Sequence, residues 1–123
     1  MILVFGGAYQ GKTEYAIKQF GCSTVCDLSE GGEPDFTKEI ITGIEAFASR
    51  LTAGGENPSE YFAAHRELWE DKVLVAADTS QGVVPMDKDV RAAREENGRL
   101  LTYLAGEAEE VHRIFCGIGK RIK

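Results

Sequence analysis

The chain has 123 residues, 43% of them hydrophobic and 28% charged, a composition typical of a folded domain and not of a disordered segment. The formal net charge is −6 and the basic residues are scattered, which argues against a nucleic-acid-binding surface. The sequence shows no signal-peptide pattern and no apolar run of about 18 residues, and its number of cysteines is odd. We therefore expect a cytoplasmic protein without membrane contact. The length predicts a single domain over residues 1–123.

The first predicted element is a short buried strand over residues 2–5, which runs into a glycine-rich turn. The turn reads Gly6-Gly7-Ala8-Tyr9-Gln10-Gly11-Lys12-Thr13 and fits the G-x-x-x-x-G-K-T spacing of phosphate-binding loops. Its backbone N–H groups would face the phosphates of ATP or GTP at the start of a helix. Lys12 would contact the β- and γ-phosphates, and the Thr13 hydroxyl would bind Mg²⁺. The alternative is a glycine-rich strand-to-helix turn that binds nothing.

A helix is predicted from Lys12 to Phe20, ended by Gly21, and a second buried strand covers residues 23–28. Asp27 falls near the carboxyl end of that strand, the edge at which parallel sheets bind ligands. A carboxylate there could hold Mg²⁺ through its water shell, and the alternative is a strand-end turn residue.

Two helices are predicted in the middle of the chain. Apolar residues recur with helical period over residues 35–51, where Asp35 is placed to cap the helix. The second helix begins at Asn57-Pro58 and extends to about Trp69. It carries an apolar edge that either packs in the core or forms a subunit interface, made of Tyr61, Phe62 and Trp69.

A third buried strand over residues 72–77 ends in a second acid, Asp78, and a loop over residues 79–85 follows. Asp87 can cap a long helix, and Gly98 within it predicts close packing. The apolar residues that we expect to face inward are Val90, Ala93, Leu100, Leu101 and Leu104. A fourth strand over residues 111–116 and a basic terminal strand over 120–123 bring the predicted sheet to about five strands.

The two histidines, His65 and His112, form no catalytic triad in the pattern of the sequence. We expect His65 on a solvated helix face and His112 in a structural role. Three arginines of the long helix either clamp phosphates or form surface pairs with nearby glutamates: Arg91, Arg94 and Arg99.

Stretches at both ends of the chain resemble one known family. Residues 1–13 resemble the start of the bifunctional adenosylcobinamide kinase/adenosylcobinamide-phosphate guanylyltransferases of cobalamin biosynthesis. Residues 73–85, with Gly82-Val83-Val84-Pro85, resemble a strand and loop of that family, and residues 110–123 its closing strand and turn. Arg94-Glu95 and Gly98-Arg99 fall in register with its long helix. The likeness covers about half of the chain, at both ends.

The resemblance implies a RecA-like P-loop fold with a mostly parallel sheet and flanking helices, and subunits that assemble into homo-oligomers. It also implies phosphorylation of the aminopropanol hydroxyl of adenosylcobinamide by ATP or GTP. The family's region that bears the guanylylated histidine has no counterpart here, so we expect the guanylyl transfer step to be lost. In this reading Lys12 stabilises charge on the transferring phosphoryl group, Thr13 and Asp27 position Mg²⁺, and Asp78 orients or deprotonates the hydroxyl.

Two other functions remain open at this stage. A non-catalytic nucleotide-binding or regulatory subunit would keep the loop without the substrate site. A P-loop kinase of another small molecule would keep both, because substrates are read by variable loops.

Overall fold

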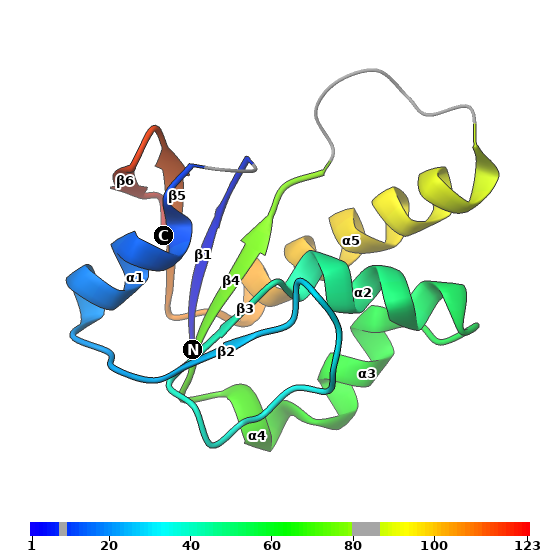
Figure 1. The fold of residues 1–123 in the computed structure, drawn as a ribbon, viewed down its shortest axis with the longest axis horizontal. Coiled ribbons are helices and arrows are strands. Elements are labelled where there is room, and N and C mark those ends of the chain that lie inside the picture. Colours follow the sequence, from blue (N-terminus) through cyan, green and yellow to red (C-terminus); the bar gives the residue numbers. More distant parts are fainter. Residues whose placement is uncertain (8–9, 80–86) are drawn as a thin grey trace.

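The structure, a computed structural model, describes residues 1–7, 10–79 and 87–123. Its centre is a six-stranded sheet with the order β2-β3-β4-β1-β5-β6 (Figure 1). β1 to β5 all run in the same direction, and β6 pairs antiparallel with β5. The strands are β1 (Ile2–Gly6), β2 (Val25–Asp27), β3 (Ile40–Thr42), β4 (Val73–Ala77), β5 (Glu110–Phe115) and β6 (Ile118–Arg121).

Helices cover both faces of the sheet. α1 (Lys12–Phe20) lies on one face, and α2 (Ile44–Ala53), α3 (Pro58–Ala64) and α5 (Lys88–Glu107) lie on the other (Figure 1). A short helix, α4 (Arg66–Trp69), leads into β4. The predicted α/β fold with a mostly parallel sheet and flanking helices is therefore confirmed. Among the described residues, none of the helices combines the length and the apolar content that crossing a bilayer requires.

The central strands are buried on both faces, as strands of a parallel sheet must be when helices cover them. In β1, Val4 packs on the α1 side and Leu3 on the side of α2 and α5. In β4 every residue is buried, and the same alternation holds. Each face of the sheet thus has its own apolar cluster, and the central strands lie between the two clusters.

The prediction of one helix over residues 35–51 is wrong in its first half. Residues Ile40–Thr42 form β3, which lies between β2 and β4 and makes six strands rather than about five. Ile40 and Ile41 are fully buried on opposite faces of the sheet, and β-branched residues favour that setting. Gly43, with φ 76°, then turns the chain into α2.

The predicted helix start at residue 57 is confirmed. The Asn57 side chain accepts a hydrogen bond from the Glu60 N–H at 3.2 Å, and Pro58 occupies the first helical position. The helix ends at Ala64, earlier than predicted, and α4 is a separate turn. Phe62 and Trp69 are buried in the core, so the first of the two expectations for this apolar edge is confirmed.

The long helix α5 is capped by Asp87, whose side chain accepts hydrogen bonds from the N–H groups of Asp89 and Val90, as predicted. Leu100 and Leu104 face the core, whereas Val90 is 52% exposed and does not. The close packing expected at Gly98 is absent, because a Cβ built there meets nothing within 4 Å.

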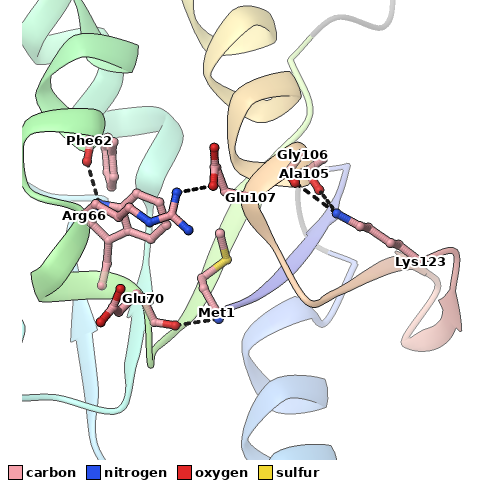
Figure 2. Close-up of polar contacts among 9 residues, drawn as sticks. Met1, Phe62, Arg66, Glu70, Ala105, Gly106, Glu107 and Lys123 are labelled. Atoms are coloured by element: carbon pink, nitrogen blue, oxygen red, sulfur yellow. Dashed lines mark hydrogen bonds and ion pairs between the residues drawn. The ribbon is translucent and has the colours of Figure 1, made fainter.

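Polar contacts tie the elements together at the amino end of β1 (Figure 2). The Met1 amino group donates to the Glu70 carbonyl at 2.6 Å, and Arg66 pairs with Glu107 of α5. The Lys123 ammonium donates to the carbonyls of Ala105 and Gly106 at 2.9 and 3.1 Å, which satisfies the carboxyl end of α5. These contacts join α4, α5 and Lys123 at this end of the sheet.

His112 connects α1 to the last two strands. It is 4% exposed, and its ring is hydrogen-bonded to the Tyr15 hydroxyl at 2.9 Å and to the Glu110 carboxylate at 3.1 Å. Arg121 of β6 extends the network through a 3.6 Å contact with Glu110. The structural role expected for His112 is confirmed. His65 differs from expectation, since it is half-buried with its ring against Tyr61.

Candidate functional site

The predicted site residues that the structure describes lie at the carboxyl edge of the parallel strands, and all but one of them stand beside the loop. Gly6 is the last residue of β1, and its carbonyl accepts a hydrogen bond from the Asp78 N–H at 2.8 Å. The structure therefore brings Asp78 beside the start of the loop. Gly7, Gln10, Gly11, Lys12 and Thr13 follow at the same edge, whereas Ala8, Tyr9 and the Gly82-Val83-Val84-Pro85 loop lie outside the described residues.

The start of α1 has a glycine as its cap residue. Gly11 precedes the helix with φ 76° and ψ 30°, a left-handed backbone conformation that residues other than glycine rarely adopt. Among the described residues, no side chain caps the helix. The N–H groups of its first turn could therefore donate to an external acceptor, and the helix dipole favours a negative one.

Lys12 is folded back over the loop. Its ammonium donates a hydrogen bond to the Gly7 carbonyl at 2.7 Å, so the positive charge lies against the loop instead of extending into solvent. Partial burial lowers the pKa of Lys12, and the carboxylates of Glu45 and Glu14 oppose this shift by favouring the charged form. The Lys12 ammonium is thus placed where it could exchange the Gly7 carbonyl for a phosphate oxygen as its hydrogen-bond acceptor.

Thr13 connects the helix to a neighbouring strand. The hydroxyls of Thr13 and Thr42, the last residue of β3, share a hydrogen bond at 3.1 Å. This contact places the Thr13 oxygen over the carboxyl edge of the sheet.

Asp27 is the exception among the predicted site residues. It pairs in register with Thr42, but it stands at the end of β2, the outermost strand, with β3 and β4 between it and β1. Its exposed carboxylate accepts a hydrogen bond from the Ser29 N–H at 2.9 Å. The arrangement is that of a strand-end turn residue and leaves Asp27 one strand away from the Thr13–Thr42 contact.

Glu45 is a candidate site residue that the sequence did not reveal. It lies in the first turn of α2, its carboxylate accepts a hydrogen bond from the Ala77 N–H at 3.2 Å, and its charge acts on Lys12. Gly43 was the signal in the sequence that could have revealed Glu45, because it separates β3 from α2 and places Glu45 in the first turn after a strand end. The continuous helix predicted over this region concealed that position.

Gln10 joins the loop to the hairpin between β5 and β6. Its side-chain oxygen accepts a hydrogen bond from the Cys116 N–H at 2.6 Å, and its carbonyl accepts one from the Gly117 N–H at 2.8 Å. Nothing in the sequence pattern marked this pairing, because the side-chain contact joins residues 106 positions apart. The hairpin tip is thereby fixed against the candidate phosphate site.

Asp78 lines a cavity of about 270 Å³ between α5 and the sheet. The cavity walls are mainly apolar and include Leu3, Phe5, Leu101 and Ala105. The buried Asn97 amide of α5 donates to the Ala77 carbonyl and to the Thr79 hydroxyl, both at 3.1 Å, and so holds the chain on either side of Asp78. One carboxylate thus stands in an apolar cavity beside the loop.

The donors at this edge fit a hard cation such as Mg²⁺, which takes oxygen ligands and keeps several waters. Thr13 supplies a hydroxyl, Glu45 and Asp78 supply carboxylates next to the end of β4, and Asp27 supplies one at the end of the outermost strand. Within residues 1–7, 10–79 and 87–123, no three His, Cys, Asp or Glu side chains gather into a metal-ligand group. Mg²⁺ in nucleotide sites needs only one or two protein ligands, because phosphates and water complete the shell.

Comparison with protein-family models and with curated proteins gives no match to this chain. The functional argument therefore depends on the geometry of the site and on the resemblance carried by the residues themselves.

Proposed function

We propose that residues Gly6 to Thr13 are a phosphate-binding loop of the P-loop class, which binds ATP or GTP with Mg²⁺. The observation that carries the proposal is the position of Lys12, whose ammonium lies 2.7 Å from the Gly7 carbonyl at the start of an uncapped helix. A bound phosphate would replace that carbonyl as the partner of Lys12. It would also receive the open N–H groups of the first turn of α1.

We further propose that the protein is a kinase of a small molecule. The acceptor hydroxyl oxygen would bond to the γ-phosphorus while the bond from that phosphorus to the β,γ-bridging oxygen breaks, which releases a nucleoside diphosphate. Asp78 would orient the hydroxyl and take its proton. Lys12 would neutralise charge on the transferring group, and phosphoryl transfer needs little beyond such positioning and charge stabilisation.

Mg²⁺, when bound with the nucleotide, would neutralise charge on the phosphates. Thr13 is the proposed protein ligand. Glu45 and Asp27 are the two candidates to hold its water shell, and Glu45 has the stronger claim because it already acts on Lys12.

The cavity beside Asp78 is the proposed acceptor site. Its volume of about 270 Å³ lies just below the range of roughly 300–1,000 Å³ that small-molecule pockets span. A whole corrinoid does not fit such a space, but a short aliphatic arm with a terminal hydroxyl does. The aminopropanol arm of adenosylcobinamide has this chemistry, and it is the acceptor that the sequence resemblance suggests.

A calorimetric titration tests the nucleotide site. Mg-ATP and Mg-GTP are titrated into the wild type, into Lys12→Ala and into Lys18→Ala, where Lys18 is an exposed lysine of the same helix. We expect at least one nucleotide to bind in the micromolar range, the Lys12 variant to lose at least about tenfold in affinity and the Lys18 variant to be unchanged. Equal binding by all three proteins, or none by the wild type, would contradict the proposal.

Product analysis then tests the kinase step. Phosphorylation of adenosylcobinamide is followed in the wild type and in Asp78→Asn, Glu45→Gln and Asp27→Asn. We expect turnover to fall most in the Asp78 variant with nucleotide affinity retained, and Mg²⁺ dependence to weaken more in the Glu45 variant than in the Asp27 variant. A panel of other alcohols is assayed in parallel: phosphorylation of one of these alone would identify a kinase of another small molecule, and nucleotide binding without turnover of any of them a non-catalytic subunit.

A further inference from the structure

We infer that Phe115 and Ile118, at the tip of the β5–β6 hairpin, form the surface on which the base of the bound nucleotide lies. We call this pair the hairpin platform. The inference rests on the proposed nucleotide site and adds to it the part that recognises the base.

The hairpin platform is an exposed apolar surface with no cover among the described residues. Phe115 is 68% exposed and Ile118 is 74% exposed, the two highest values among the exposed large hydrophobic residues of the described chain. The two residues are directly paired across the strands, so their side chains emerge on the same face of the hairpin. Water contact with this much adjoining apolar surface is unfavourable, which favours a flat ligand there.

The hairpin platform is fixed to the phosphate loop. Cys116 and Gly117 form the two-residue turn between Phe115 and Ile118, and both have positive φ, 50° and 75°, as a tight hairpin of this length requires. The same two residues donate their N–H groups to Gln10 at 2.6 and 2.8 Å. The platform therefore keeps a constant position relative to the loop, and Figure 1 shows the hairpin beside the start of α1.

The position suits a nucleobase because a nucleotide has only a sugar between its phosphates and its base. Phosphates held at the start of α1 leave the base near the loop, and the hairpin platform is an exposed apolar surface on either side of the turn that is hydrogen-bonded to that loop. An aromatic ring stacks on the face of any base. Neither platform side chain can donate or accept a hydrogen bond, so the surface reads no base edge and should accept ATP and GTP alike.

The test separates the base from the phosphates. Mg-ATP, Mg-GTP and Mg-tripolyphosphate are titrated into the wild type, Phe115→Ala and Leu68→Ala. Leu68 is a matched control because it is an exposed apolar residue, 47% exposed, on α4. We expect the Phe115 variant to lose about tenfold in affinity for both nucleotides and nothing for tripolyphosphate, with the Leu68 variant unchanged throughout.

Three results would overturn the inference. The first is unchanged ATP affinity in Phe115→Ala, and the second is an equal loss for tripolyphosphate, which would show an effect on the loop alone. The third is a wild type that binds ATP no better than tripolyphosphate, which would support the phosphate-binding loop but reject the hairpin platform as the surface for the base. A wild type that binds none of the three ligands would reject the proposed nucleotide site itself. If light scattering shows that Phe115→Ala dissociates an oligomer while ATP binding persists, the surface belongs to a second copy of the chain.

Discussion

The ring of Tyr15 lies directly against Gly119, in the space that any larger side chain at that position would need. A Cβ built on Gly119 would be 2.1 Å from Cε2 of Tyr15 and 2.5 Å from its hydroxyl. The contact seats α1 against β6, and the same Tyr15 hydroxyl is bonded to the buried His112. The absence of a side chain at residue 119 thus decides how closely the helix after the loop approaches the hairpin.

We therefore expect Gly119→Ala to destabilise the fold by about 1–3 kcal/mol, because the tyrosine ring must shift away from His112. Urea unfolding measures the loss. In a double-mutant cycle with Tyr15→Ala, the alanine at residue 119 should cost clearly less, since the ring that it meets is gone. Equal cost in both backgrounds would place the strain elsewhere.

The hairpin turn should be improved by one substitution. Cys116 is the only residue other than glycine with positive φ among the described residues, and asparagine tolerates that conformation better than cysteine. Cys116→Asn should raise the free energy of unfolding by about 0.5–1 kcal/mol, and Cys116→Val should lower it because β-branched residues disfavour positive φ. Both backbone contacts to Gln10 are retained in either variant, so the affinity for nucleotide should change little in both of them.

The proposed acceptor cavity can be filled without harming the fold. Gly98 lines the cavity, and a Cβ there meets nothing within 4 Å, as is also true of Gly106 further along α5. Replacing a helical glycine should itself stabilise the helix by up to about 1 kcal/mol. We expect Gly98→Leu to reduce turnover at least about tenfold with nucleotide affinity unchanged, a loss equivalent to roughly 1.4 kcal/mol.

Gly106→Leu is the matched control, since residue 106 does not line this cavity. It should retain full turnover when both variants are assayed with the same acceptor. Equal activity of the two variants would show that the acceptor binds elsewhere.

Lys12 should lower the free energy of unfolding in the absence of nucleotide, although the proposed nucleotide site depends on it. Its pKa is lowered chiefly by burial, so the folded state disfavours the ammonium, and this penalty applies at every pH where the unfolded chain carries the charge. Lys12→Met should therefore have a higher Tm than the wild type at neutral pH without nucleotide, and should not bind ATP. The difference in Tm should shrink as the pH rises through the pKa of Lys12. A lower Tm for the variant at neutral pH would contradict this account.

Local signals in the sequence were sufficient for several elements. The apolar run before Gly6 predicted β1, and the Asn57-Pro58 pair and Asp87 marked two helix starts that the structure confirms through capping hydrogen bonds. These features depend on residues within a few positions of one another, where backbone preference and capping act.

β3 shows where such reasoning fails. The spacing of Ile40, Ile41 and Ile44 fits a helical period as well as it fits a buried strand followed by a helix. Only pairing with Val25 on one side and Val73 on the other decides that Ile40 belongs to a strand. The missed strand also displaced Glu45 from the predicted site, because its place beside Ala77 depends on where α2 begins.

The sequence by itself determined that the glycine-rich turn connects a buried strand to a helix, and that Asp78 follows another buried strand. Only the tertiary structure decided that Asp78 lies beside Gly6, that Asp27 stands on the outermost strand and that Gln10 holds the hairpin tip at Cys116. The physical reason is range. Backbone preferences and caps act over a few residues, whereas strand order and loop contacts depend on which apolar faces pack together across the whole chain.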